Sequence, residues 1–156
     1  MILMGVDPGL SGALAFLDTD SGDLEILDMP TLKAGTGGKR IIDLDTLARE
    51  IDARSDYVRH AFVEAVSTRP GEGAVGAFSF GQGFGALCGI IVANFIPRTF
   101  VRPAVWKKAL GVPAAKDAAR DRASQLLPQH AGQWARVKDD GRAEAALIAY
   151  YGSKKL

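Results

Sequence analysis

The N-terminal part of the chain alternates short apolar runs with polar, glycine-containing breaks. Met1–Phe16 (MILMGVDPGLSGALAF) has one apolar run of strand length, a break at Pro8–Gly12, and a second apolar run that begins at Ala13. This pattern predicts a β-hairpin. Leu24–Met29 follows a turn and has the alternation of another strand. We therefore expect three antiparallel strands at the start of the fold.

Beyond these strands the pattern alternates between helical and strand periods. Further strands are expected at Tyr57–Val66 and Arg98–Arg102. Helical patterns occupy Ile41–Arg54, with Asp43 as a cap, Ala86–Phe95, the segment from Pro103 to a stop at Gly111, Ala114–Leu127 and Asp139–Tyr151. Pro30–Arg40 is rich in glycine and is expected to form a loop without secondary structure. The order predicts an α/β fold, with a mixed five-stranded sheet flanked by helices in one domain over residues 1–156.

The composition is that of an ordinary globular protein, with 47% hydrophobic and 24% charged residues among 156. The apolar runs read as shorter than the roughly 20 residues of a membrane span, so no membrane partner is expected. The N-terminus lacks the basic start of a signal peptide. Together with a single cysteine, Cys88, this predicts a cytoplasmic protein, in a bacterial cell or a phage-infected host.

The net charge of +1 hides an asymmetry along the chain. Residues 1–97 contain 7 Lys and Arg against 13 Asp and Glu, whereas residues 98–156 contain 12 against 5. An acidic cluster beside a basic surface suits a polyanionic partner that is also held by metal ions. Chance scatter of surface charge gives the same totals, so the split alone supports nucleic acid only modestly.

Four carboxylates lie at the ends of predicted strands or at the start of a predicted helix. Asp7 ends the first strand, Glu64 ends a later one, and Asp140 and Glu144 share one face at the start of the last helix. An acid that ends a buried strand needs a partner charge, hydrogen bonds or a metal, although Asp7 before Pro-Gly can also simply begin a turn. Convergent carboxylates repel one another, and a pair of Mg²⁺ ions relieves that repulsion. Two metals about 4 Å apart support phosphodiester hydrolysis.

Thr68–Gly85 combines six glycines with aromatic residues and leads into an apolar helical run. Such a lead can place backbone N–H groups against a phosphate, or it can simply allow a helix to pack closely on the sheet. It is not a Walker A loop, because no Gly-Lys-Ser/Thr follows. Its phenylalanines are candidates for wedging between bases or stacking on them, namely Phe78, Phe80 and Phe84.

Four segments together resemble the RuvC-type Holliday junction resolvases, especially the phage and organellar branch. They are GVDPGLSGALAF, the strand that ends FVEAV, RPAVWKKALGV followed by KDAARDRA, and DDGRAEAALIAYYG. The resemblance runs in order over nearly the whole chain. It implies an RNase H-like fold, a homodimer, and symmetric nicking of branched DNA, the four-way junction, with Mg²⁺ or with Mn²⁺ as a substitute.

Carried over by position, the resemblance assigns metal binding and catalysis to Asp7, Glu64, Glu144 and, in the fourth place, Asp140. Bacterial resolvases space their last two acids three residues apart, whereas Asp140 and Glu144 are four apart, and Asp139 is the alternative to Asp140. Lys116 matches a family lysine that contacts DNA or assists catalysis. Basic residues expected at the DNA are Lys107, Lys108, Lys116 and Arg120, and the resemblance places the aromatic loop at the junction centre.

Three other functions are compatible with parts of this pattern. An RNase H-like nuclease acting on flaps, single strands or RNA:DNA hybrids would use the same acids. An actin-like or sugar-kinase-type ATP-binding fragment also opens with Gly-x-Asp-x-Gly, but it needs a second domain for which 156 residues leave no room. A junction-binding protein without catalysis would not need all four acids.

Overall fold

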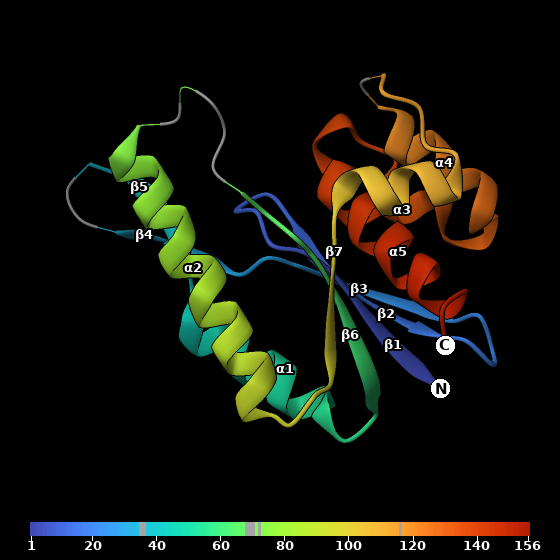
Figure 1. Cartoon of the computed structure of the whole chain (residues 1–156), viewed down its shortest axis with the longest axis horizontal. Coiled ribbons are helices and arrows are strands. Elements are labelled where there is room, and N and C mark those ends of the chain that lie inside the picture. The colour runs from blue at the N-terminus through green and yellow to red at the C-terminus, as the bar shows by residue number, and fades with distance from the viewer. Residues whose placement is uncertain (35–36, 68–70, 72, 116) are drawn as a thin grey trace.

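The central element is the expected five-stranded sheet, seen in a computed structural model that describes residues 1–34, 37–67, 71, 73–115 and 117–156. Its strand order is β3-β2-β1-β6-β7 (Figure 1). The strands are β1 (Ile2–Asp7), β2 (Ala13–Asp18), β3 (Leu24–Asp28), β6 (Val58–Glu64) and β7 (Arg98–Val101). The first three are antiparallel neighbours, and β6 and β7 continue the sheet parallel to β1. The predicted mixed sheet is confirmed.

Helices cover both faces of this sheet (Figure 1). They are α1 (Leu44–Ser55), α2 (Ala74–Ala93), α3 (Pro103–Leu110), α4 (Ala118–Leu126) and α5 (Asp140–Ser153), with short 3-10 turns η1 (Pro128–Trp134) and η2 (Val137–Asp139) before α5. Helices α1 and α2 lie on one face, and α3, α4 and α5 lie on the other. The predicted caps are confirmed: Asp43 accepts a hydrogen bond from the Thr46 backbone N–H, 3.1 Å away, and Gly111 ends α3 with φ +65°.

Helix α5 packs on the sheet with almost no space between the two backbones. A Cβ added at Gly5 in β1 would lie 2.2 Å from the Ala145 carbonyl oxygen, and one added at Gly152 would lie 2.3 Å from the Phe62 ring. Real side-chain carbons do not approach so closely, so glycine is required at both places. This packing fixes the height of α5 above the end of β1.

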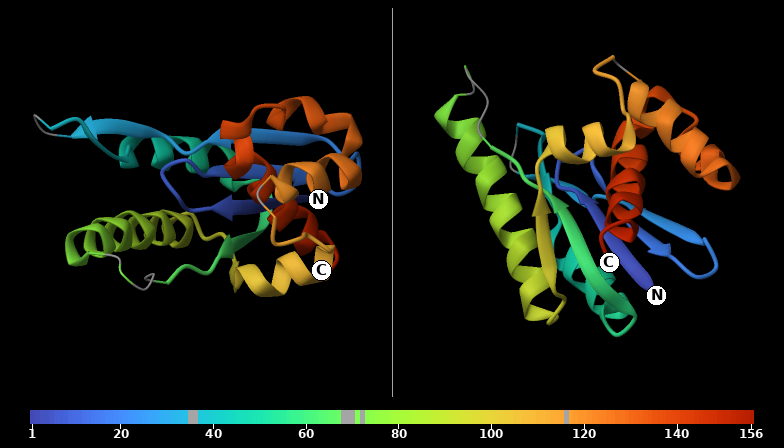
Figure 2. Two further views of the ribbon diagram at one scale, coloured as in Figure 1. Left: turned by 90° about the horizontal axis from the view of Figure 1, so that it is seen from above. Right: turned by 45° about the vertical axis from the view of Figure 1, so that its right-hand side comes forward.

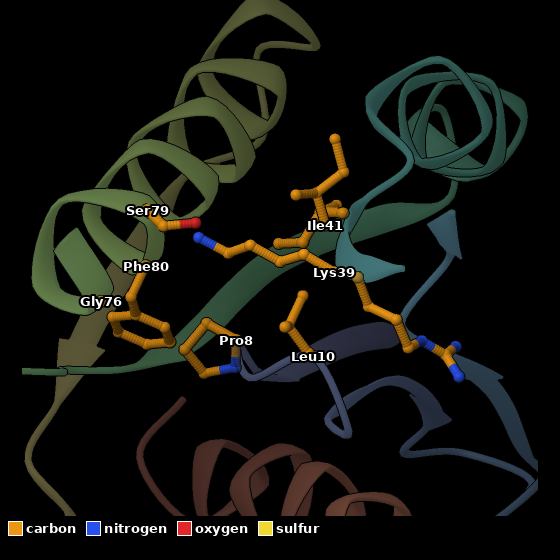
Figure 3. Close-up of a pocket in the computed structure, with 9 residues that line it drawn as sticks. Pro8, Leu10, Lys39, Ile41, Gly76, Ser79 and Phe80 are labelled. Carbon is orange, nitrogen blue, oxygen red and sulfur yellow. The ribbon is translucent and has the colours of Figure 1, made fainter. Parts of the chain in front are cut away.

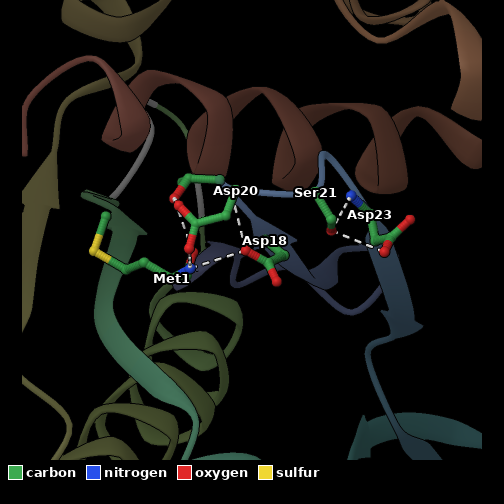
Figure 4. A network of polar contacts seen from close by, with 6 residues as sticks. Met1, Asp18, Asp20, Ser21 and Asp23 are labelled. Atoms are coloured by element: carbon green, nitrogen blue, oxygen red, sulfur yellow. Dashed lines mark hydrogen bonds and ion pairs between the residues drawn. The ribbon is translucent and has the colours of Figure 1, made fainter.

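The chain start is tied to the far end of the first hairpin (Figure 4). The N-terminal amine of Met1 lies 2.9 Å from Asp18 Oδ1 and 2.5 Å from Asp20 Oδ2, and these two carboxylates raise the pKa of the amine. The same turn continues with a hydrogen bond of 2.8 Å from the Ser21 hydroxyl to Asp23. These contacts hold the ends of β1 and β2 together.

A second, two-stranded sheet corrects the expectation of a loop at Pro30–Arg40. Strands β4 (Thr31–Ala34) and β5 (Lys39–Ile42) form an antiparallel hairpin that projects beyond the main sheet (Figure 2). Gly38 has φ +68°, a conformation typical of glycine in a tight turn. Gly38, one of the glycines that suggested an irregular loop, serves the turn of a hairpin.

Helix α2 corrects two further expectations. It begins at Ala74, so most of the expected glycine-rich loop is helical and Phe78, Phe80 and Phe84 lie on a helix. It is also 20 residues long with a mean hydropathy of 1.6, and by length and composition alone it could cross a membrane. The expectation of only short apolar runs is wrong because the glycines were read as breaks in the run. Only 11% of that apolar stretch is buried in the fold.

Candidate active site

Parallel pairing of β1 with β6 brings two of the predicted acids to one edge of the sheet. Val6 pairs with Val63, so the next residues, Asp7 and Glu64, end adjacent strands at the same edge. Asp7 Oδ1 accepts a hydrogen bond of 3.2 Å from the Gly9 N–H in the turn that follows. That turn is tight, because a Cβ added at Gly12 would lie 2.1 Å from the Asp7 carbonyl oxygen.

The N-terminal end of α5 brings a third acid, Glu144, to the same place. A Cβ added at Gly141 would lie 3.1 Å from Asp7 Oδ2 and only 2.2 Å from the Ser11 carbonyl oxygen. The first turn of α5 is therefore pressed against the β1–β2 turn, and Glu144 stands one turn further along the helix.

The pKa of Asp7 shows how strongly these acids interact. Burial raises the pKa of Asp7 from its ordinary value of 3.8 to about 7, and the nearby negative charge of Glu144 adds to the increase. The Gly9 N–H opposes the increase, Glu64 adds to it, and the Lys107 ammonium opposes it. Asp7, Glu64 and Glu144 thus form one electrostatically coupled cluster, from three elements that are distant in the sequence.

Helix α3 supplies a hydrogen-bonding partner to each of the other two acids. The indole Nε1 of Trp106 donates to Glu64 Oε2 at 2.8 Å, and Lys107 Nζ lies 2.7 Å from Glu144 Oε1. Trp106 is fully buried, and its role as a donor to an acid was missed by the sequence analysis. Lys107, expected at the DNA, lies against the acid cluster. The sequence WKK alone does not indicate which acid each of its side chains contacts.

The two aspartates proposed for the fourth position occupy different environments. Asp139 is 5% exposed and is held by the Arg136 guanidinium and backbone N–H, and that guanidinium lowers the pKa of Asp139. Asp140 is more exposed and pairs with Arg120 at 2.8 Å. The three-residue spacing of bacterial resolvases would place an acid at Gly141, where the Ser11 carbonyl leaves no room for a side chain. Of the two aspartates, Asp140 lies on α5 one turn before Glu144.

The predicted basic residues are not equivalent in the structure. Lys108 is exposed on α3, whereas the Arg120 guanidinium is largely enclosed by ion pairs with Asp117 and Asp140. Lys116 lies outside the described residues. Of these two residues, Lys108 is therefore the exposed cation, and Arg120 is engaged in ion pairs.

The three candidate aromatic residues also differ. Phe78 is 68% exposed on α2, and Phe80 lines a cavity near Asp7 (Figure 3). Phe84 packs against the core and against Phe100, with ring centroids 6.0 Å apart. Phe78 and Phe80 are thus accessible to a ligand, whereas Phe84 is partly buried against the core.

The donor chemistry of the cluster fits a hard divalent cation. Asp7, Glu64 and Glu144 offer carboxylate oxygens, which Mg²⁺ and Mn²⁺ prefer, and the Lys107 ammonium already places one positive charge at 2.7 Å from Glu144. Among the described residues, no group of three or more His, Cys, Asp or Glu side chains is close enough to hold a metal ion as the side chains stand. Binding would therefore require the carboxylates to turn toward one another.

Comparison with solved structures identifies proteins that share this fold. The chain is similar to the RuvC structure of Thermus thermophilus, with a TM-score of 0.60, 19% identity, and coverage of 99% of this chain and 96% of that chain. It is also similar to T. thermophilus RuvC in complex with a Holliday junction substrate, with a TM-score of 0.64, 16% identity and the same coverage. The chain has the RuvC fold. The expected RNase H-like arrangement, with its mixed sheet flanked by helices, is thereby confirmed.

No protein-family model and no curated protein matches the sequence. At this level of identity the similarity shows a shared fold and no more.

Proposed function

We propose that the chain is a divalent-metal-dependent endodeoxyribonuclease that resolves four-way DNA junctions by paired symmetric nicks. The observation that carries the proposal is the coupled cluster of Asp7, Glu64 and Glu144 at one edge of a RuvC-type sheet, with the pKa of Asp7 raised to about 7. A fold gains nothing in stability from three acids that repel one another, so their convergence favours a catalytic or ligand-binding role.

Asp7, Glu64 and Glu144 would hold Mg²⁺, with Mn²⁺ as a substitute, and Asp140 is the candidate for a fourth ligand. When bound, the metal would supply the positive charge that activates water and polarises the phosphodiester. The chain's own residues orient this site: Trp106 holds Glu64 through its indole N–H, and Lys107 balances Glu144. Lys108, adjacent on α3 and exposed, would contact a DNA phosphate.

Symmetric nicking of a junction requires two active sites, and α2 offers a surface for a second copy of this chain. The helix contains no charged residue, and it exposes Val75 (77%), Phe78 (68%) and Val92 (47%). Gly81 and Gly85 face open space, so another helix can approach the backbone closely. An uncharged apolar surface of this kind suits an isologous dimer, in which the same helix meets itself.

Gly85→Glu tests this surface, because it would place two carboxylates in the middle of the proposed interface. We expect wild type to sediment as a dimer and Gly85→Glu as a folded monomer. Gly132→Glu in η1, another open glycine, is the matched control and should stay dimeric. A monomeric wild type, a dimeric Gly85→Glu variant, or a wild type that partitions into lipid vesicles would contradict the assignment of α2 to a dimer.

The runner-up activity is cleavage of flaps, single strands or RNA:DNA hybrids by the same site. The carboxylate cluster acts on a phosphodiester and does not distinguish these substrates. A panel of labelled four-way junction, linear duplex, flap and hybrid, each with Mg²⁺ and with EDTA, separates the two. The proposal predicts Mg²⁺-dependent cleavage of the junction alone, whereas preferential cutting of the flap or hybrid would support the runner-up.

A further inference from the structure

A groove of about 470 Å³ lies between the border of the main sheet and the last turns of α5. Strand β7, helix α3 and the end of α5 contribute to its lining, which contains no residue of the acid cluster and none of α2. Tyr151 and Phe62 supply apolar walls, with ring centroids 6.4 Å apart in an edge-on arrangement. The groove is therefore a feature separate from both surfaces described above.

The charges that line this groove have one sign. Arg102, where β7 meets α3, and Lys155, just after α5, are both exposed, and none of the described lining residues has an acidic side chain. The Lys155 ammonium lies 5.2 Å from the centroid of the Tyr151 ring, so its charge stands over an apolar wall. The groove therefore favours a ligand that combines negative charge with an apolar side chain.

Strand β7 also offers backbone hydrogen-bonding groups, because it is the last strand of the main sheet (Figure 1). The Pro97 and Val101 carbonyls each accept a hydrogen bond of 2.8 Å from the β6 side. Backbone groups alternate in direction along a strand, so Arg98 and Phe100 direct their N–H and C=O groups to the opposite side. In the described part of the chain no strand pairs with β7 there. An extended peptide can add to the sheet at such an edge.

A strand added to β7 would direct alternate side chains into the groove. Thr99 pairs with Phe62 in the register of the sheet, so the two side chains lie on the same face, and Val101 shares it. All three line the groove. Because neighbouring strands keep this alternation, every second side chain of an added peptide would enter it. The four residues of β7 limit the pairing to a short segment.

We propose that this groove binds a short, extended, acidic segment of a partner protein, which adds to the outer edge of β7 and inserts an apolar side chain against Tyr151. A peptide is favoured over a nucleic acid because a peptide backbone matches the hydrogen-bond spacing of a strand edge. The inference goes beyond the proposed nuclease function, since this binding needs neither metal nor DNA.

Selection from a randomised library of displayed linear peptides, in EDTA and without DNA, tests the groove. Wild type should enrich sequences that carry Asp or Glu and place apolar residues at alternate positions. Val105→Trp, on the α3 wall, fills the groove and should not enrich them. Enrichment of no sequence by wild type, or of sequences without acidic residues, would overturn the proposal. One enriched peptide, synthesised with a fluorescent label, is the probe for the titrations that follow.

Reversing both cations of the groove measures their contribution. Arg102→Glu combined with Lys155→Glu should weaken binding of the labelled peptide by about 10-fold or more, because each change replaces an attraction by a repulsion. The matched control reverses Arg49 and Lys154, two exposed cations outside the described lining, and should bind like wild type. Equal losses in the two double variants would indicate unspecific charge attraction and would contradict the groove.

Methylation of the peptide's backbone nitrogens, one residue at a time, tests strand pairing without altering the protein. Methyl groups at alternate positions should weaken binding by roughly 10-fold, and those at the positions between should have little effect. The reason is that only every second N–H of an added strand faces β7. A peptide that tolerates methylation at every position would overturn the addition of a strand.

The same variants distinguish two other occupants. If no peptide is enriched and a labelled single-stranded oligonucleotide binds less tightly to the doubly reversed groove variant, the groove belongs to a nucleic-acid interface. If Val105→Trp dissociates a wild-type oligomer in sedimentation, a second copy of the chain fills the groove. Either result would overturn the proposal. Peptide binding by a wild type that cuts no DNA would leave this inference standing and remove the nuclease, and cleavage without peptide binding would do the reverse.

Discussion

Replacing Asp7 by asparagine removes the carboxylate whose ionisation the fold opposes most clearly. We expect Asp7→Asn to abolish cleavage and, in the absence of metal, to make the folded chain more stable. Asparagine keeps an oxygen that can accept the hydrogen bond from the Gly9 N–H. In the wild-type chain this bond to Asp7 is 3.2 Å long. The variant therefore removes the charge while preserving the turn.

The magnitude follows from the pKa of Asp7. Burial and then Glu144 raise it from 3.8 to about 7, and each pKa unit corresponds to 1.36 kcal/mol. Ionised Asp7 therefore costs the folded chain up to about 4 kcal/mol. Below pH 3.8 both the folded and unfolded chains hold the proton and the cost vanishes. As the pH rises toward 7 the unfolded chain loses that proton first, so the stability of wild type falls relative to Asp7→Asn.

Urea unfolding in EDTA at pH 4 and pH 8 measures this difference. The free energies of unfolding of wild type and Asp7→Asn should be similar at pH 4, and the variant should be more stable by about 2–4 kcal/mol at pH 8. Asp52→Asn removes an exposed carboxylate on α1 and should change the free energy by less than about 0.5 kcal/mol at either pH. Equal stability of wild type and Asp7→Asn at pH 8 would refute the argument from a strained acid cluster.

Two further predictions concern α3. Trp106→Phe removes the donor to Glu64 and should lower both cleavage and the free energy of unfolding, the latter by about 1.5–3 kcal/mol. Trp134→Phe, which removes a hydrogen bond to a neutral hydroxyl instead, should leave cleavage intact; equal effects of the two variants on cleavage would contradict the positioning role. Lys107→Ala should move the rise of the pH–rate profile to higher pH, because this ammonium opposes the increase in the pKa of Asp7. Lys108→Ala should only weaken DNA binding and reduce its salt dependence, and an unshifted profile for Lys107→Ala would exclude Lys107 from the cluster.

Much of the scaffold could be predicted because its signals are local. The short apolar runs, the Asp43 cap, and the stop at Gly111 each depend on a few neighbouring residues, and the structure confirms them. The convergence of Asp7 and Glu64 was also predictable, since acids that end adjacent parallel strands meet at one edge. Glu144 was singled out both by its place at the start of the last helix and by the family resemblance.

The features that were missed depend on contacts between distant segments. Glycine was read as a break, yet Gly83 sits inside a helix so that α2 can approach β5, and Gly38 makes a hairpin turn. The partners of the acids are set by tertiary packing, which hydrophobic periodicity does not predict. Gly141 fits closely against the β1–β2 turn. Trp106 and Lys107 project toward Glu64 and Glu144, respectively. Helical periodicity marks a buried face, but it does not say which acid a buried indole will meet.

The measurement that tests the central claim most directly is mapping of cleavage sites on a mobile four-way DNA junction labelled in each strand. The account predicts paired nicks at symmetry-related positions in opposite strands with Mg²⁺ or Mn²⁺, none in EDTA, and none with Asp7→Asn, which should still bind the junction. An uncut junction that both proteins bind equally well in Mg²⁺ would contradict a nuclease. Cutting by Asp7→Asn at the wild-type rate would contradict the assignment of the active site to this cluster.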